Sequence, residues 1–482
     1  MIHKGENVFS MLRKEKFIKS LLILSVFIIS VLLHLAAPVS AKSLQQEGPT
    51  YLVQQGDTLG SIALQFGVDI NELQSINQIS DPNALDIGQR LTIPGLEGIA
   101  GLLTSQTISF GDSLMTLTRT YQLEQNALLT LNRLSSPAEV IAGAKFIIPI
   151  NEGEDPLAPS VGMPQDLTIL ETAIHLGTSP WILQRENQLN GSWDAIPGEI
   201  LFTQSESESN TGNLATIDRV NVFPLPLVQG ETTEISVLTN VEKQITGFLG
   251  EETLHFFTDE ESIYTSFYGV HALANPGLIP LQISTIDSDG NKITYEQLVR
   301  VTSGGYGNEW VTVEDEYLDR DAIAAEDAYV ADFFQNLSPE KHWDGLFQYP
   351  VDDPCINSFF GQRRNYNNGA YYFYHTGMDF GVCAPNLNIY APAAGEVVMS
   401  EPLTVKGNAI LIDHGWGVFS GYWHLSEFEV EVGDFVETGD LIGLIGNTGR
   451  SAGPHLHFEI DIHGTPINPQ TWLTQSFPSF EP

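Results

Sequence analysis

The sequence is poor in basic residues. Only 21 of its 482 residues are lysine or arginine, against 60 aspartates and glutamates, so the formal net charge is −39. A chain this acidic repels phosphate backbones, and we therefore expect no nucleic-acid partner. The length predicts about three or four domains, at roughly 100–200 residues per domain. An apolar fraction of 42% is ordinary for proteins that form globular cores.

Cysteine is equally scarce. Only Cys355 and Cys383 occur, and they are not in a CxxC-type spacing, which disfavours a zinc site built from the pair. In an exported chain an even number of cysteines usually forms disulfides, so we predict a Cys355–Cys383 bond.

The sequence has a single long apolar run, and it lies near the N-terminus. It extends from Leu21 to Leu33 after a lysine- and arginine-rich start, and small residues follow it. This pattern predicts a secretory signal peptide over 1–41, cleaved after Ala41. The alternative is an uncleaved membrane anchor, although the run is short for a span of about 20 residues. Either way we expect the rest of the chain to be extracellular or in the cell envelope, touching the membrane only if the signal stays uncleaved.

The first half of the sequence contains a repeat. Asn77, Asn132 and Asn187 follow one another at the same spacing, and so do Gly88, Gly143 and Gly198. In the first copy, "YLV" and "RLTIP" bracket two short stretches with helical apolar periodicity, which predicts a βααβ unit. The third copy is eroded, because Asp166-Leu167 replaces the Gly-Asp of the other two.

The Gly-Asp-Thr-Leu turn and the asparagine before "IGQRLTIP" make these units resemble LysM modules. The resemblance covers 51–94 and 106–149 well and 166–204 weakly, and it implies binding to N-acetylglucosamine-containing glycans. By position, it places glycan contacts at Asp57, Thr58, Leu59 and Ile79 in the first module, and at Asp112, Ser113, Leu114 and Leu134 in the second. The alternative is structural: the leucines pack at a helix start and the aspartates cap it.

The middle of the chain changes pattern. Short alternating runs over 219–302, with turn residues at Asp287–Lys292, predict an antiparallel β-sandwich that acts as a spacer, and an Ig-like sandwich is one form of it. Asp287 and Asp289 lack the further acidic ligands of a calcium site, so a plain turn is the preferred interpretation. The acidic segment 306–345 predicts a helical linker.

Six of the 12 histidines lie from His375 onward. In "HLHFEIDI" polar and apolar residues alternate, which predicts a strand with His455, His457 and Glu459 on one face. Two histidines and an aspartate would hold zinc with a fourth position open, as catalytic zinc sites do. No HExxH motif occurs, so the helix-borne glutamate base of thermolysin-type enzymes is absent.

The motifs "HTGMDF", "YWHL" and "GPHLHFE", in this order, resemble those of lysostaphin/LytM-type zinc endopeptidases. The resemblance implies a mainly antiparallel β catalytic domain over 346–475. By position it implies zinc ligands and two catalytic histidines, and Tyr422 as a groove-lining residue: the ligands are His375, Asp379 and His457, and the catalytic histidines are His424 and His455. For Glu459 we expect a surface or supporting role near a ligand, and for His414 and His463 a place at strand ends.

The sequence thus predicts a multidomain protein of βααβ LysM modules, an all-β sandwich and a β catalytic domain. Its expected function is that of a secreted zinc-dependent endopeptidase, held on peptidoglycan glycan by LysM modules, that cuts stem or cross-bridge peptides. The alternative is a non-enzymatic wall-binding regulator of other hydrolases.

Overall fold

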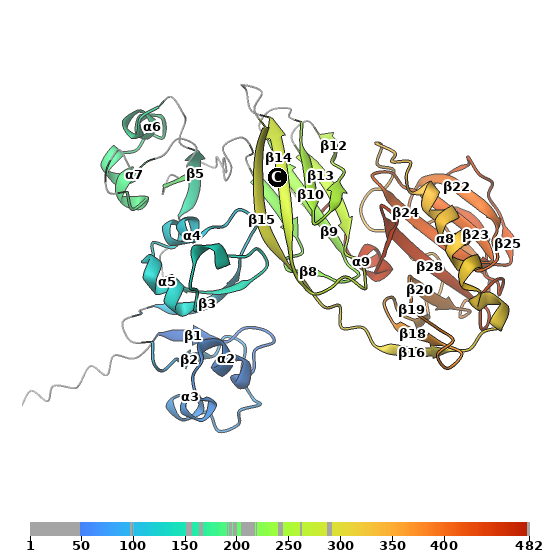
Figure 1. The fold of residues 1–482 in the computed structure, drawn as a ribbon, viewed down its shortest axis with the longest axis horizontal. Helices are drawn as coiled ribbons and strands as arrows, with labels where there is room; N and C mark the ends of the chain where they lie inside the picture. Colours follow the sequence, from blue (N-terminus) through green and yellow to red (C-terminus); the bar gives the residue numbers. More distant parts are fainter. Residues whose placement is uncertain are drawn as a thin grey trace, which may run out of the picture.

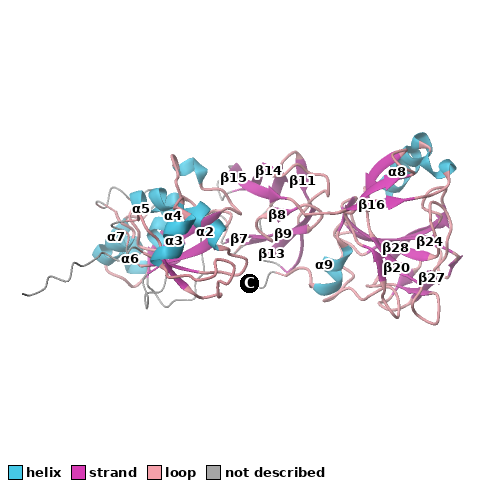
Figure 2. Cartoon of the chain, turned by 90° about the horizontal axis from the view of Figure 1, so that it is seen from below, coloured by secondary structure: helices cyan, strands magenta, loops and turns pink. Residues whose placement is uncertain are grey.

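The computed structural model describes residues 49–479, apart from 97–98, 100, 151–156, 163–166, 190, 192–194, 196–199, 204–216, 218, 240–243, 261–262 and 287–291. The predicted signal peptide 1–41 and the predicted turn residues at 287–291 lie outside the described residues. Within the described part, no helix is both long and apolar enough to cross a membrane. Helices gather at the N-terminal end of the molecule, whereas strands dominate the middle and the C-terminal part (Figure 2).

Each of the three predicted repeats folds as strand, helix, helix, strand. The elements are β1 (Thr50–Leu52), α2 (Leu59–Phe66), α3 (Ile70–Ile76) and β2 (Arg90–Thr92); β3 (Leu102–Thr107), α4 (Leu114–Thr120), α5 (Gln125–Leu131), the 3-10 turn η1 (Pro137–Glu139) and β4 (Lys145–Ile150); and β5 (Ala158–Gly162), α6 (Ile169–His175), α7 (Pro180–Glu186) and β6 (Ile200–Thr203). The third copy keeps the order of the other two despite its eroded turn. Its first strand begins at Ala158, before the predicted start at 166.

The repeated asparagine has the same structural task in every copy. The side-chain Nδ2 of Asn77 donates to the carbonyls of Leu73 and Thr92, and its Oδ1 accepts from the Thr92 N–H. Asn132 and Asn187 make the equivalent three hydrogen bonds. Each asparagine therefore ties the end of the second helix to the last strand, which accounts for its regular spacing.

The repeats are joined to one another and to the sandwich. Strand β1 pairs in parallel with β3, so the first two repeats share the four-stranded sheet β2-β1-β3-β4. The Ala142 N–H donates to the Leu298 carbonyl at 3.1 Å, and the Arg300 N–H donates to the Ala142 carbonyl at 3.0 Å. These bonds place the second repeat against the edge of the β-sandwich (Figure 1).

The middle segment forms two sheets that share one apolar core, which includes Val222, Ile235, Leu281 and Val299. The sheet orders are β11-β10-β14-β15-β8 and β12-β13-β9-β7. The strands are β7 (Arg219–Phe223), β8 (Leu227–Val228), β9 (Thr232–Leu238), β10 (Thr246–Leu249), β11 (Glu252–Leu254), β12 (Phe257–Glu260), β13 (Ile263–Gly269), β14 (Gly277–Ile286) and β15 (Lys292–Thr302). Strands β14 and β15 pair antiparallel on either side of the predicted turn. The Ig-like character of this sandwich stays a prediction.

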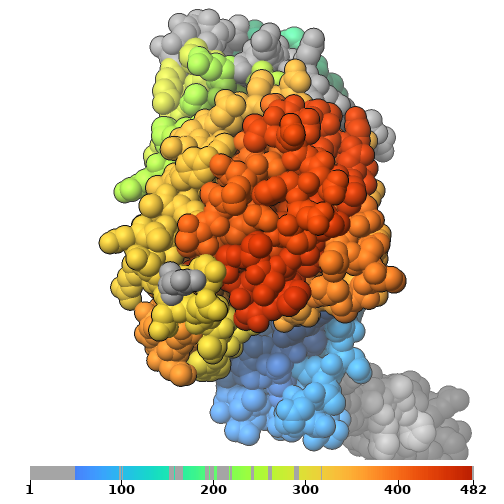
Figure 3. All heavy atoms as spheres, turned by 90° about the vertical axis from the view of Figure 1, so that its right-hand side faces the viewer, coloured from blue at the N-terminus to red at the C-terminus, as the bar shows by residue number. Residues whose placement is uncertain are grey.

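The segment predicted as a helical linker is more than a linker. It contains the strand β16 (Asn308–Val311), the 3-10 turn η2 (Asp315–Leu318) and the helix α8 (Arg320–Phe333). Strand β16 pairs with a strand of the C-terminal domain. The Glu326 carboxylate on α8 accepts from the backbone N–H groups of Val405 and Lys406, each at 2.8 Å. Atoms of this segment lie directly beside the later strands in the space-filling view (Figure 3).

The C-terminal domain is built mainly of antiparallel sheets, as predicted. Its elements are β17 (Ile356–Ser358), β18 (Arg363–Tyr366), β19 (Tyr371–Tyr374), β20 (Met378–Gly381), β21 (Asn388–Tyr390), β22 (Gly395–Pro402), β23 (Asn408–Asp413), β24 (Val418–Leu425), β25 (Glu427–Phe428), β26 (Phe435–Val436), β27 (Leu441–Leu444), β28 (His455–Ile462), β29 (Thr465–Ile467) and α9 (Pro469–Thr474). The largest sheet has the order β17-β20-β28-β24-β23-β22-β26, with β29 beside β28, and smaller sheets have the orders β21-β27-β25 and β16-β18-β19.

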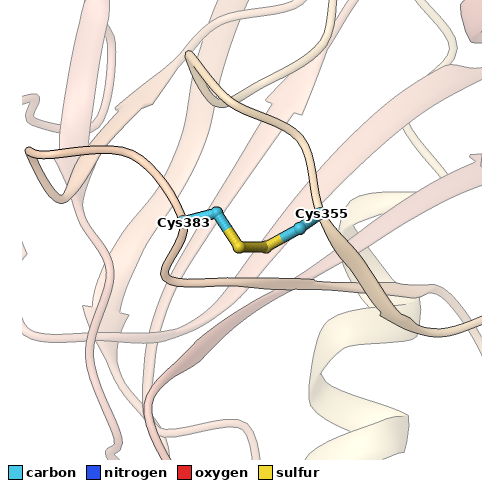
Figure 4. The surroundings of a disulfide bond; sticks show 2 residues. All are labelled: Cys355 and Cys383. Carbon is cyan, nitrogen blue, oxygen red and sulfur yellow. A yellow bond between two sulfur atoms is a disulfide. The ribbon is translucent and has the colours of Figure 1, made fainter.

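Two features brace this domain. The predicted disulfide is present: the sulfur atoms of Cys355 and Cys383 are bonded, and they join the segments that flank β17 and β20 (Figure 4). On the sandwich side, Trp472 of α9 donates from Nε1 to the hydroxyl of Thr232 at 2.8 Å. Phe267 of the sandwich packs in the core of the C-terminal domain. The sandwich is therefore packed against that domain and is not a detached spacer.

Candidate active site

Three side chains meet on the large sheet of the C-terminal domain. Oδ1 of Asp379 lies 2.9 Å from Nε2 of His375 and 2.8 Å from Nδ1 of His457, and the two ring nitrogens are 3.0 Å apart. All three residues are buried. Among the residues that the structure describes, this is the group of histidine, cysteine and acidic side chains that could hold a metal ion.

The sequence pattern explains why the three meet. Strand β28 alternates as predicted, and His457 lies directly opposite Asp379 on β20, so both point to the same face of the sheet. His375 follows β19 and enters from the neighbouring segment. Gly377 between them is required by close packing, because a Cβ there would lie 2.3 Å from the Phe458 carbonyl and 2.8 Å from Nε2 of His457.

The ring nitrogen of each histidine that points away from Asp379 has its own hydrogen-bond partner. Nδ1 of His375 lies 2.8 Å from the Phe359 carbonyl, and Nε2 of His457 lies 2.9 Å from Oε1 of Glu459. Because a carbonyl and a carboxylate only accept, each of these ring nitrogens carries the hydrogen. Glu459 is therefore a buried partner of His457 and does not lie on the surface.

This arrangement fits a metal ion. In the neutral rings, the Nε2 atom of His375 and the Nδ1 atom of His457 then have no hydrogen. Together with Oδ1 of Asp379 they are three electron-pair donors that face one another, which only a cation can satisfy. Two imidazoles and one carboxylate are a ligand set that zinc accepts.

The pKa values of the three groups are consistent with such a site. Burial lowers the pKa of His375. Burial would raise the pKa of Asp379, but His375 and His457 outweigh it and hold it well below its usual value. Burial would lower the pKa of His457, but Asp379 and Glu459 raise it. A metal ion bound here would compete with a proton for Nδ1 of His457.

His424 and His455 lie beside this group. Their ring centroids are 5.0 Å apart, and that of His424 lies 6.0 Å from the His457 ring. Nδ1 of His424 donates to the Thr448 carbonyl at 2.8 Å, and Nδ1 of His455 donates to the Gly453 carbonyl at 2.7 Å. Each neutral ring therefore keeps an unprotonated Nε2. Burial, together with His455 and His457, holds the pKa of His424 well below its usual value.

The prediction that Tyr422 lines the groove is wrong. Tyr422 is fully buried in the core, against Phe458, and its hydroxyl lies 2.7 Å from that of Ser420. The prediction came from the family resemblance, by position, and a fully extended strand would also have placed Tyr422 and His424 on one face. The φ angle of His424 is +71°, however, so the backbone leaves the extended conformation and the alternation breaks there.

A cleft of about 400 Å³ opens above the group. Asp379, His424 and His455 line it, and residues of strand β16 line it as well. A smaller inner pocket of about 50 Å³ reaches His375 and His457 and shares Arg364 and Arg450 with the cleft. The acidic segment therefore forms a wall of the cleft.

Sequence reasoning missed three residues that line the cleft: Arg364, Glu309 and Trp310. Nη2 of Arg364 lies 2.7 Å from Oδ2 of Asp379, and its Nε lies 2.8 Å from Oε2 of Glu309 on β16. Trp310, next to Glu309, lines the cleft and is 70% exposed. Arg364 lies on β18, and a strand of four residues is too short for its alternation to be recognised in the sequence. The pairing of β16 with β18 was not visible in the sequence either.

The predicted glycan contacts occupy different kinds of position in the modules. Leu59 and Leu114 are buried in the cores of their modules, so they are packing residues and the binding prediction for them is wrong. Thr58 and Ser113 are exposed helix N-caps. Oδ2 of Asp57 accepts from the Gln54 N–H and the Tyr51 hydroxyl, so it stabilises the turn before the cap. Ile79 and Leu134 are half-buried.

The second module meets the sandwich at its predicted groove. A cavity of about 530 Å³ lies between Asp112 and Ser113 on one side and β15 on the other. The Gly111 N–H donates to Oε1 of Gln297 at 2.7 Å across it. This cavity is larger than the histidine cleft but contains no comparable chemistry.

The two remaining histidines lie at strand ends, as predicted. His414 follows β23 and is fully buried, with Nδ1 2.7 Å from the Ala394 carbonyl and Nε2 2.7 Å from the Ser420 hydroxyl. His463 follows β28. Neither contacts the metal-site residues.

Comparison with known families agrees with this geometry. Residues 373–469 match the model of peptidase family M23, and residues 51–94 and 107–149 match the LysM domain model. The chain therefore carries an M23 peptidase domain and two LysM domains, which confirms both resemblances. That the third repeat is also a LysM module stays a prediction.

Several curated relatives match a part of this chain. The peptidoglycan DD-endopeptidase ShyA of Vibrio cholerae is 40% identical over 134 residues, which are 27% of this chain and 31% of that protein. The DD-carboxypeptidase/endopeptidase Mpg of Neisseria meningitidis is 44% identical over 96 residues, 20% of this chain and 22% of that protein. The chain thus aligns with less than a third of each relative. The catalytic domain of lysostaphin from Staphylococcus simulans is 28% identical, with a TM-score of 0.20, over 30% of this chain and 98% of that structure.

Proposed function

We propose that this protein is a zinc-dependent endopeptidase that hydrolyses the peptide cross-links of bacterial peptidoglycan. The observation that carries the proposal is the convergence of His375, Asp379 and His457 at 2.8–3.0 Å, with two more histidines beside them in an open cleft. The proposed ligands are these three residues, and the proposed catalytic histidines are His424 and His455.

The roles follow from the hydrogen bonds. Zinc, when bound, would polarise the scissile carbonyl and lower the pKa of water toward about 7. The carbonyls of Thr448 and Gly453 fix the tautomers of His424 and His455, so that Nε2 of each is the free atom. One of these Nε2 atoms accepts a proton from the attacking water and returns it to the leaving amine. The other ring would stabilise the oxyanion that forms on the substrate in its imidazolium form, in which Nε2 also carries a hydrogen and donates it to the oxyanion.

The relatives suggest which bond is cut. ShyA is named a peptidoglycan DD-endopeptidase and Mpg a DD-carboxypeptidase/endopeptidase. We therefore place the cleaved bond between D-amino acids of the cross-link, and the place of action in the cell envelope or outside the cell.

The LysM domains would hold the enzyme on the glycan. Tethering raises the local concentration of the peptide without adding catalytic contacts. The exposed residues of the predicted grooves that remain available for N-acetylglucosamine-containing glycan are Thr58 and Ser113, each beside a half-buried aspartate.

The alternative function is a non-enzymatic wall-binding regulator. Such a protein needs neither three converging donor atoms nor two further histidines. The test is a soluble cross-linked muropeptide dimer incubated with the protein, with and without a zinc chelator. The peptidase splits the dimer only when zinc is present, and the His455→Ala variant does not split it. An intact dimer with zinc-loaded wild-type protein would favour the regulator.

A further inference from the structure

We propose that Arg450 forms a specificity site for a carboxylate group of the peptide substrate, an inference that rests on the proposed peptidase function. Arg450 lies in the loop between β27 and β28 and lines both the cleft and the inner pocket. Its backbone N–H donates to the Val405 carbonyl at 2.7 Å, which anchors the loop. Its side chain lines both hollows, as does that of His424.

The guanidinium group is held by aromatic rings. Its carbon lies 5.1 Å from the centre of the Tyr366 ring and 6.0 Å from that of Tyr371. Stacking of this kind positions an arginine without using its N–H donors. Nη1 of Arg450 is buried and has no hydrogen-bond partner. A buried donor of a charged group without a partner is unfavourable, and a ligand acceptor would remove this cost once the side chain turns Nη1 toward the cleft.

The other cations of the cleft are already paired. Arg364 contacts Asp379 and Glu309. Lys406 lies 3.8 Å from Oδ1 of Asp327. The charge of Arg450 acts on the pKa of Asp327, but the two residues form no ion pair. Within the described part of the chain, no acidic side chain forms an ion pair with Arg450. In a chain with 60 acidic residues and 21 basic ones, this arginine is left free to bind an anion.

The anion that fits is a carboxylate. The planar guanidinium fork binds a carboxylate through two parallel hydrogen bonds, which fix its direction as well as its charge. The cleft also contains His424 and His455, so the bound carboxylate lies close to the scissile bond. Two carboxylates of a cross-linked peptide have this chemistry: the free C-terminal carboxylate of a strand and an unamidated carboxylate within it.

The test uses three soluble versions of one cross-linked peptide: the parent, a version amidated at the C-terminal carboxyl, and a version amidated at the interior carboxyl. For wild-type protein we expect one amidated version to have kcat/KM about 10- to 100-fold below the parent, mainly through KM. That version identifies the recognised carboxylate. In the Arg450→Gln variant the same ratio falls to near one. Arg450→Lys, which keeps the charge but loses the fork, gives an intermediate ratio.

Arg320→Gln is the matched control. Arg320 is exposed on α8 and stacks on the same Tyr371 ring at 6.0 Å, but it does not line the cleft. It should keep the wild-type ratio. Zinc content and melting temperature of each variant show whether the fold is retained.

Two results overturn the inference. One is equal kcat/KM for all three peptides with wild-type protein. The other is an Arg450→Gln variant in which kcat/KM falls by the same factor for all three peptides, so that the ratio of parent to amidated peptide stays at its wild-type value. If no version is cleaved by zinc-loaded wild-type protein, the proposed peptidase function itself is refuted, which separates the two failures.

Discussion

Nη2 of Arg364 lies 2.7 Å from Oδ2 of Asp379, while Oδ1 of the same carboxylate faces the two imidazoles. The two oxygens of Asp379 therefore have separate tasks, one toward the metal position and one toward the arginine. Glu309 on β16 holds the other side of Arg364. The strand that precedes the M23 match thus helps to orient a proposed metal ligand.

This relationship predicts the effect of Arg364→Lys. A lysine keeps the charge but cannot contact Asp379 and Glu309 at once, so the carboxylate is less well oriented. We expect zinc affinity to fall about 10- to 100-fold, as for other residues that orient metal ligands. Competition with a chelator measures it. Arg363→Lys is the control, because Arg363 points to the Ala272 carbonyl and stacks on Tyr306. An unchanged affinity in Arg364→Lys would contradict the role.

The ligand and catalytic histidines should separate in one experiment. His457→Ala removes a donor atom, so the purified protein should lose its zinc. His455→Ala leaves the three donors in place, so it should keep one zinc per chain and lose activity. Metal analysis together with a peptide assay measures both. One zinc per chain in His457→Ala would show that the ligand assignment is wrong.

Stability should depend on pH through His414. Burial lowers its pKa from 6.5 to about 4. Between about pH 6.5 and pH 4, His414 is protonated in the unfolded chain but stays neutral in the folded protein. The free energy of unfolding therefore decreases as the pH falls through this range. His414 alone lowers the free energy of unfolding by about 3 kcal/mol over this pH range. His414→Gln should flatten the fall between these pH values, measured by urea unfolding. His463, whose pKa burial also lowers to about 4, remains and keeps part of the slope.

The LysM domains should affect binding more than chemistry. Deletion of residues 51–204 should weaken pulldown on insoluble peptidoglycan and leave cleavage of a soluble peptide largely intact, because the histidine cleft contains no residue of that region. The melting curve of the shortened protein shows whether loss of the contact at β15 disturbs the sandwich. Pulldown equal to that of the full chain would exclude the tethering role.

Features that follow from regular local patterns were predictable from the sequence. The alternation of β28 and the spacing of Asn77, Asn132 and Asn187 each follow from local geometry, and both are confirmed.

Features that depend on contacts between distant segments were not predictable. Tyr422 was assigned to the groove by position from the family resemblance, but it packs against Phe458 in the core. The roles of Glu309 and Trp310 depend on β16 pairing with β18 across a long stretch of chain. For Leu59 and Leu114, by contrast, the structural alternative named from the sequence holds, because both pack into the module cores.

The most direct test of the account is mass spectrometry of the fragments that zinc-loaded protein releases from purified sacculi. We predict new peptide termini at the cross-link with the glycan chains intact, and none with His455→Ala protein. Release of cut glycan with intact cross-links, or no new termini with wild-type protein, would contradict the account.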